Sequence, residues 1–189
     1  MPPHPKLVVV KIGGGLTAVS GALRRVCDTV ARAAQQRPIV VVPGGGPFAD
    51  AVRQFDRQVG LSPEAAHWMA LLAMDQYAHV LADLMPGSAL LEEPGAIPDY
   101  LGSGRALVLA PSRWMRAADV LPHSWDATSD SIAAFVAGAL GADRLVLVKP
   151  VSNSGQPLDP CFPATVPAGL PYYLVGCECL DELETRLTS

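Results

Sequence analysis

The sequence predicts an α/β fold in which a mostly parallel β-sheet is covered on both faces by helices. Short apolar runs rich in β-branched residues alternate with longer segments of helical periodicity, and parallel strands need such helical crossovers between them. Half of the 189 residues are apolar, which supports a sizeable core and excludes disorder as the main state. The length suits one domain, so we expect residues 1–189 to form a single unit.

The predicted strands are short and almost wholly apolar, as expected for strands that are buried on both faces. The first, second and fifth are the strongest because Val, Ile and Leu dominate them, and the others are weaker. In chain order, strands are expected at residues 7–11, 39–42, 89–91, 106–110, 144–149 and 172–175.

The predicted helices are recognised by their caps and by apolar side chains at spacings of three and four. Ser20 is expected to cap the first helix, Ser62 precedes Pro63 at the start of the longest, and Thr128 or Ser129 opens the fourth. With their caps, helices are expected at residues 20–34, 48–59, 62–85, 128–140 and 180–187. Residues 152–169 are rich in Pro and Gly and predict a loop with little regular structure.

Composition excludes several classes of function. The net charge of −4 argues against nucleic-acid binding, which usually needs a basic face. No apolar run approaches the ~20 residues that span a bilayer, and the proline-broken start does not resemble a signal peptide. The four cysteines lack CxxC spacing, which favours ordinary thiols in a reducing cytoplasm. We therefore expect a cytoplasmic protein without membrane or nucleic-acid partners.

Two glycine turns follow the first two strong strands. Ligands of open parallel sheets bind beyond the carboxyl ends of the strands, where both turns lie. Such turns let backbone N–H groups cradle phosphate oxygens, although they could equally be tight connections between strand and helix. Neither turn continues as a P-loop or a dinucleotide fingerprint, so a phosphate site of another design is expected. The turns comprise Gly13, Gly14 and Gly15, and Gly44, Gly45 and Gly46.

Two lysines end otherwise apolar strands. Lys11 closes the first strand and Lys149 the fifth, and a lysine buried there needs an anion, unless it reaches solvent. Asp130 lies in the first turn of a predicted helix, where it could complement the helix dipole or hold both lysines. Paired cationic side chains beside glycine turns favour a site of phosphoryl transfer.

Several side chains are weaker candidates for a substrate pocket. They come from the longest predicted helix and from the loop before the fourth helix, and core or surface packing is the alternative interpretation. These candidates are Trp68, Asp75, His123, Trp125 and Asp126, with His67 beside them.

The chain resembles the amino acid kinase family in LVVVKIGGG (7–15), VVPGGGPFA (41–49) and TSDSIAA (128–134). It is similar to the branch that acts in methanofuran biosynthesis in four further segments. These are GLSPEAAHWMA (60–70), LAMDQY (72–77), LPHSWDATSD (121–130) and LDPCFP (158–163). The resemblance implies a three-layer α/β/α kinase fold, use of ATP with Mg²⁺, a small-molecule substrate, and assembly into homodimers or larger homo-oligomers.

The resemblance also implies roles for individual residues. Lys11 and Lys149 would contact the transferring phosphoryl group, and Asp130 would orient them. The glycines at 13–15 would approach the nucleotide phosphates, and those at 44–46 the acceptor or its phosphate.

The acceptor implied by this branch is a phosphorylated aminomethylfuran. An acceptor phosphate is largely ionised at neutral pH, so no general base is expected. An aminomethyl cation would require carboxylates and aromatic faces, which Asp75, Asp126, Trp68 and Trp125 provide.

One segment departs from the family pattern. Residues 149–155, KPVSNSG, replace the usual Val-Asp-Gly stretch, so the nucleotide side is expected to be shortened. Two alternatives stay open: a non-catalytic kinase-fold subunit that binds a phosphorylated metabolite, and a kinase for an amino acid or a nucleoside monophosphate.

Overall fold

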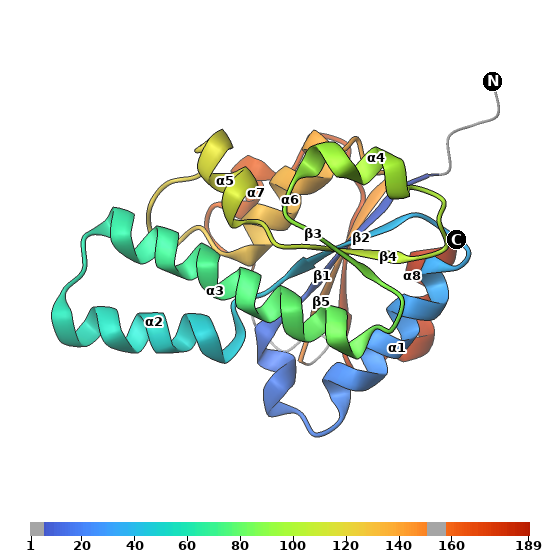
Figure 1. Ribbon diagram of the computed structural model, residues 1–189, viewed down its shortest axis with the longest axis horizontal. Helices are drawn as coiled ribbons and strands as arrows, with labels where there is room; N and C mark the ends of the chain where they lie inside the picture. The colour runs from blue at the N-terminus through green and yellow to red at the C-terminus, as the bar shows by residue number, and fades with distance from the viewer. Residues whose placement is uncertain (1–5, 151–157) are drawn as a thin grey trace.

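A computed structural model describes residues 6–150 and 158–189, and within them the chain forms three layers (Figure 1). The middle layer is a six-stranded sheet in the order β3-β4-β2-β1-β5-β6, and every pair of neighbours is parallel. The strands are β1 (Val8–Ile12), β2 (Ile39–Pro43), β3 (Ala89–Leu91), β4 (Ala106–Leu109), β5 (Arg144–Lys149) and β6 (Tyr172–Gly176). The predicted α/β class is confirmed.

Helices cover both faces of the sheet (Figure 1). The α-helices are α1 (Ala22–Ala34), α2 (Gly46–Val59), α3 (Pro63–Leu84), α4 (Ile97–Tyr100), α5 (Ser112–Ala118), α6 (Ser129–Ala139), α7 (Phe162–Thr165) and α8 (Leu180–Thr188). Two 3₁₀ turns, η1 (Gly14–Ala18) and η2 (Pro94–Ala96), complete the elements. Helices α1 and α8 pack on one face, α5, α6 and α7 pack on the other, and α3 contributes to both apolar clusters. Within the described part of the chain, every helix is too short or too polar to cross a membrane.

Strand register brings the ends of the three strong strands to one edge. β1 lies between β2 and β5, so Lys11 is level with Val42 on one side and Leu147 on the other. β1, β2 and the first five residues of β5 are fully or almost fully inaccessible apart from Arg144, as their Val-, Ile- and Leu-rich sequences predict. The segments that follow these strands therefore meet at the same edge of the sheet.

The helix starts were predicted well where a local cap decides them. The Ser62 hydroxyl accepts from the amide of Ala65, and the N-cap of α6 is Thr128. The predicted cap of α1 is wrong, because Gly21, with φ of 67°, precedes the helix and no side chain caps it. The left-handed backbone at this position favours glycine.

Short helices account for most other differences, and α2 starts at Gly46, two residues before the predicted start. Neither α4 nor α5 was predicted, and α7 lies within the segment expected to be irregular. Helices of four to seven residues are stabilised by tertiary contacts more than by their own sequence, so periodicity does not reveal them. Of the predicted loop, residues 158–161 and 166–169 contain no helix or strand, as expected. Residues 152–157, with most of the shortened segment after Lys149, lie outside the described residues.

Candidate phosphoryl-transfer site

The two glycine turns lie directly against each other at the ends of β1 and β2. The amide of Gly44 donates to the carbonyl of Ile12 at 2.8 Å. A Cβ on Gly14 would lie 2.1 Å from the amide nitrogen of Gly46, and a Cβ on Gly44 would lie 2.4 Å from that of Gly14. Side chains are excluded at these contacts, which explains why both turns are built of glycine.

The first turn is also held against the end of β5. The Gly13 amide donates to the carbonyl of Val148 at 3.0 Å, and a Cβ on Gly15 would lie 2.9 Å from the ring of Pro150. Three chain segments thus converge with little space between their backbones. This convergence fixes the position of Lys11 on one side of the turn and of Lys149 on the other.

Lys11, Asp130 and Lys149 form a buried charge cluster at this convergence. The Lys11 ammonium lies 2.9 Å from Oδ1 of Asp130, and the Lys149 ammonium donates to Oδ2 at 2.7 Å. All three residues are buried, with exposed fractions of 5%, 3% and 8%. Strands β1 and β5 and the first turn of α6 each supply one member, so the sequence prediction that one carboxylate holds both lysines agrees with the geometry.

The two lysines keep the Asp130 carboxylate ionised. Burial alone would raise the pKa of Asp130, but the charges and hydrogen bonds of the two lysines outweigh it and hold that pKa below its usual value. Burial lowers the pKa of Lys11, and Asp130 offsets this only in part. With both lysines protonated, the cluster carries one excess positive charge, which suits a phosphoryl group.

Asp159, which the sequence analysis did not select, holds the start of α6. Its carboxylate accepts from the amide and hydroxyl of Thr128, at 2.9 and 2.8 Å, and from the amide and hydroxyl of Ser131, the amide at 2.9 Å. Asp130 lies between these two residues, so Asp159 fixes the turn that directs Asp130 at the lysines. The only sequence signal was an aspartate within the LDPCFP segment.

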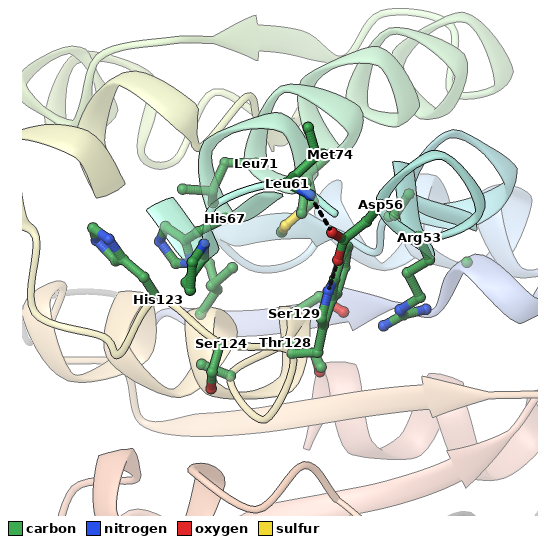
Figure 2. A pocket seen from close by; sticks show the side chains of 18 residues that line it. Arg53, Asp56, Leu61, His67, Leu71, Met74, His123, Ser124, Thr128 and Ser129 are labelled. Atoms are coloured by element: carbon green, nitrogen blue, oxygen red, sulfur yellow. Dashed lines mark hydrogen bonds between the residues drawn. The ribbon is translucent and has the colours of Figure 1, made fainter. Parts of the chain in front are cut away.

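A cavity of about 410 Å³ opens beside the glycine turns, between α2, α3 and the loop that precedes α6 (Figure 2). Gly14, Gly45 and Ser129 are part of the lining, and Ser129 is the chain neighbour of Asp130. Apolar side chains make much of its wall, with polar groups at a few points, as in most small-molecule sites. Its side-chain lining includes Arg53, Asp56, Leu61, His67, Leu71, Met74, His123, Trp125, Thr128 and Ile132.

One side of this cavity is formed by stacked imidazoles. His67 and His123 lie with ring centroids 4.4 Å apart and planes 17° from parallel. Trp68 meets both rings edge-on, and the Arg116 guanidinium lies 4.9 Å from the centre of a Trp68 ring. Nε2 of His123 lies 2.8 Å from Oδ1 of Asp119. The pKa of His67 is lowered, mainly by burial and then by the neighbouring charge of His123.

Arg53 and Asp56 lie on the other side of the cavity (Figure 2), where the Trp125 ring joins them in the lining. The Trp125 indole N–H donates to Oδ2 of Asp56 at 2.8 Å, and the amide of Leu61 donates to Oδ1 at 3.0 Å. The Arg53 guanidinium lies 4.7 Å from the centre of the Trp125 ring. Neither Arg53 nor Asp56 was selected from the sequence, because nothing in α2 alone indicates which of its polar residues meets a distant loop.

The predicted pocket residues separate into two groups. His123 and Trp125 line the cavity, whereas Trp68 supports it from behind the histidines. Asp75 lies elsewhere, because its carboxylate accepts from the amide of Ser112 at 3.0 Å and from the Ser112 hydroxyl. Asp126 is exposed and is not part of the lining. The two carboxylates expected to serve an acceptor amine are therefore not in the pocket.

Sequence comparison identifies the relatives of this chain. Residues 6–153 match the profile of the amino acid kinase family. A 5-(aminomethyl)furan-3-ylmethyl phosphate kinase from Methanocaldococcus jannaschii is 28% identical over 148 residues, which cover 77% of this chain and 66% of that protein. A uridylate kinase from Methanothrix thermoacetophila is also 28% identical, over 78% of this chain and 63% of its own. The chain thus spans just under two thirds of each relative.

Solved structures share the fold. The uridylate kinase of Archaeoglobus fulgidus superposes with a TM-score of 0.59 at 22% identity, over 80% of this chain and 68% of that one. An isopentenyl phosphate kinase superposes with a TM-score of 0.60 at 14% identity, over 96% of both chains. The family profile spans well over half of the sequence, and the three-layer architecture agrees with it. The chain belongs to the amino acid kinase family.

Proposed function

We propose that this protein is a kinase that transfers the terminal phosphoryl group of ATP to a small molecule that already carries a phosphate. The observation that carries the proposal is the buried Lys11–Asp130–Lys149 cluster, set beside two glycine turns that open onto a cavity. Lysines at such a position provide positive charge where a phosphoryl group is transferred, and the turns provide space for phosphate oxygens.

The proposed reaction requires charge and position more than acid–base chemistry. An oxygen of the acceptor phosphate attacks the γ-phosphorus of ATP, the bond from that phosphorus to the β–γ bridging oxygen breaks, and the products are a diphosphate and ADP. A phosphate monoester has a second pKa of ~6, so its oxygen is mostly ionised at pH 7 and needs no base. Lys11 and Lys149 would neutralise the transferring group while Asp130 keeps them in place.

In this proposal Mg²⁺ enters with the nucleotide. Magnesium in kinases usually takes its ligands from substrate phosphates and water, with one or two protein carboxylates. The described residues contain no group of three or more His, Cys, Asp or Glu side chains arranged to hold a metal ion. The glycine turn at 13–15 and the two lysines fit the nucleotide phosphates, and the ion would neutralise the charge of those phosphates.

For the acceptor we propose a phosphorylated aminomethylfuran as the first compound to test. The similar proteins are named as kinases of a furanylmethyl phosphate, of uridylate and of isopentenyl phosphate. Each of these three acceptors already carries a phosphate. A cavity of about 410 Å³ with an apolar wall suits a small ring compound. Glycines 44–46, at the N-terminus of α2, would receive the acceptor phosphate.

We also propose that the protein works in the cytoplasm as a homo-oligomer. Phe55 and Val59 on α2 and Leu72 on α3 are exposed by about half of their surface. Phe55 and Val59 are four residues apart and so share one face of the helix. Exposed apolar side chains of this kind suit a contact between subunits. Light scattering during size-exclusion chromatography tests this, and a monomer at micromolar concentration would contradict it.

The kinase proposal is tested by calorimetry and by turnover. We expect ATP with Mg²⁺ to bind in the micromolar to low-millimolar range, and Lys11→Ala to abolish binding or turnover. Lys6→Ala is the matched control, because Lys6 precedes the same strand but is exposed and pairs with Asp143 at 3.7 Å instead of with the charge cluster. The absence of binding at millimolar ATP in the wild-type protein would contradict the kinase and favour a subunit that only binds a metabolite.

A further inference from the structure

Asp56 and Arg53 lie three residues apart on α2 but do not pair with each other. The Arg53 guanidinium pairs with Asp50 at 3.3 Å and lies over the Trp125 ring. The indole N–H of Trp125 is directed at Asp56 instead. The loop before α6 thus inserts a neutral aromatic side chain beside the carboxylate, where an arginine on the same helix face could otherwise have reached it.

Within the described part of the chain, the Asp56 carboxylate therefore accepts hydrogen bonds but makes no direct ion pair. Its two donors, the Leu61 amide and the Trp125 indole, are both neutral. Across residues 6–150 and 158–189, no lysine, arginine or histidine nitrogen lies within 4.0 Å of this carboxylate. Each carboxylate oxygen can accept a second hydrogen bond, so the group retains capacity for a ligand.

The position of Asp56 separates it from the reacting end of the cavity. Asp56 is ten residues beyond Gly46 along α2, which is about 15 Å at 1.5 Å per residue. Figure 2 shows its carboxylate on the side of the cavity opposite His67 and His123. A ligand whose phosphate lies at the glycine turns would thus present a different part of itself to Asp56.

We infer that Asp56 determines acceptor specificity by binding a primary ammonium group of the acceptor. The inference rests on the proposed function and assigns the acceptor class as an amine-bearing phosphate. A cation would neutralise the unpaired carboxylate and donate to its free lone pairs, whereas a hydroxyl would donate without supplying charge. Trp125 holds the carboxylate in place and leaves its outer lone pairs open.

The experiment compares two acceptors that differ only in the amine. The first is 5-(aminomethyl)furan-3-ylmethyl phosphate, and the second is its analogue with a methyl group in place of the aminomethyl group. We expect the wild-type enzyme to prefer the amine. Asp56→Asn should raise KM for the amine by at least about tenfold, leave kcat nearly unchanged, and change KM for the analogue by less than about twofold.

Glu64→Gln is the matched control for Asp56→Asn. Glu64 also accepts from a tryptophan indole, that of Trp68 at 3.4 Å, but it lies outside the cavity lining. This variant should keep the discrimination between the two acceptors. Thermal melting of both variants detects a folding defect directly. Such a defect would also affect the two acceptors equally, whereas a loss of recognition would affect only the amine.

The outcomes separate this inference from the proposed function. Turnover of both furans with equal KM in the wild type, or an equal effect of Asp56→Asn on both, would overturn the ammonium assignment and leave the kinase intact. Preference for uridine monophosphate over either furan would do the same. If neither furan nor the nucleotide is phosphorylated, the proposed function fails. In that case equal calorimetric affinity of wild type and Asp56→Asn for the amine would overturn the inference as well.

Discussion

Replacing Asp130 by Asn tests whether one carboxylate holds the charge cluster together. The substitution keeps the shape of the side chain but leaves two buried ammonium groups that both lie within 3 Å of it. Removing one partner of a buried ion pair costs about 3–5 kcal/mol, because the remaining charge has no compensation. For a chain of this size, that loss corresponds to a fall in Tm of roughly 6–20 °C.

The stability difference between wild type and Asp130→Asn should also depend on pH. The pKa of Asp130 in the folded protein lies below the ordinary value of 3.8 for an aspartate, so its contribution is complete above that value. The contribution is lost as pH falls from about 4 through the lower, folded-state pKa. Urea unfolding at several pH values should therefore give a constant difference near neutrality and a shrinking one below pH 4. Turnover should fall by about 10²–10³-fold at pH 7.

Glu182→Gln is the control for this experiment. Glu182 makes an exposed ion pair with Arg186 on α8 at 3.4 Å, far from the site, so its loss should change stability by less than about 0.5 kcal/mol. Our reasoning would be refuted if Asp130→Asn melted within a few degrees of the wild type and retained turnover. That result would mean that neither lysine depends on the carboxylate for its position or its charge.

Four further predictions concern positions around the site. Gly44→Ala should lower the free energy of unfolding in urea by more than about 2 kcal/mol, because its Cβ would meet the backbone of the first glycine turn. Its control, Gly95→Ala, has open space around the new Cβ and should change that free energy by less than about 1 kcal/mol. Asp159→Ala should lower Tm and kcat together, since it removes the side chain that holds α6; an unchanged kcat would show that α6 keeps its start without it. Asp75→Ala should cost about 1–2 kcal/mol and leave acceptor KM unchanged, and a raised KM would return this residue to the pocket. Burial raises the pKa of the Cys27 thiol to about 12, so mass spectrometry should find it unmodified by iodoacetamide at pH 8 until the protein is unfolded.

The sequence by itself determined the sheet, most of the longer helices and the edge at which the glycine turns and the two lysines converge. Short apolar runs of β-branched residues that end at glycine, such as the one closed by Lys11, favour buried strands, and open parallel sheets bind ligands beyond the carboxyl ends of their strands. The glycine turns and the two strand-end lysines could therefore be assigned to a common edge before any contact was known. For Asp130 the sequence left a helix-dipole role open, and the resemblance to the family implied that it orients the lysines.

Only the tertiary structure decided which carboxylates serve the site. Asp75 was selected from its place on a helix face, but the turn of α5 that it holds is 37 residues away in the chain. Asp56 and Asp159 were overlooked for the same reason, since their partners lie 69 and 28 to 31 residues away. The charge and shape of a side chain are local properties, whereas its partners depend on how separate segments pack. Strands and glycine turns follow from local sterics and periodicity, while the lining of a cavity depends on contacts between segments that no local pattern encodes.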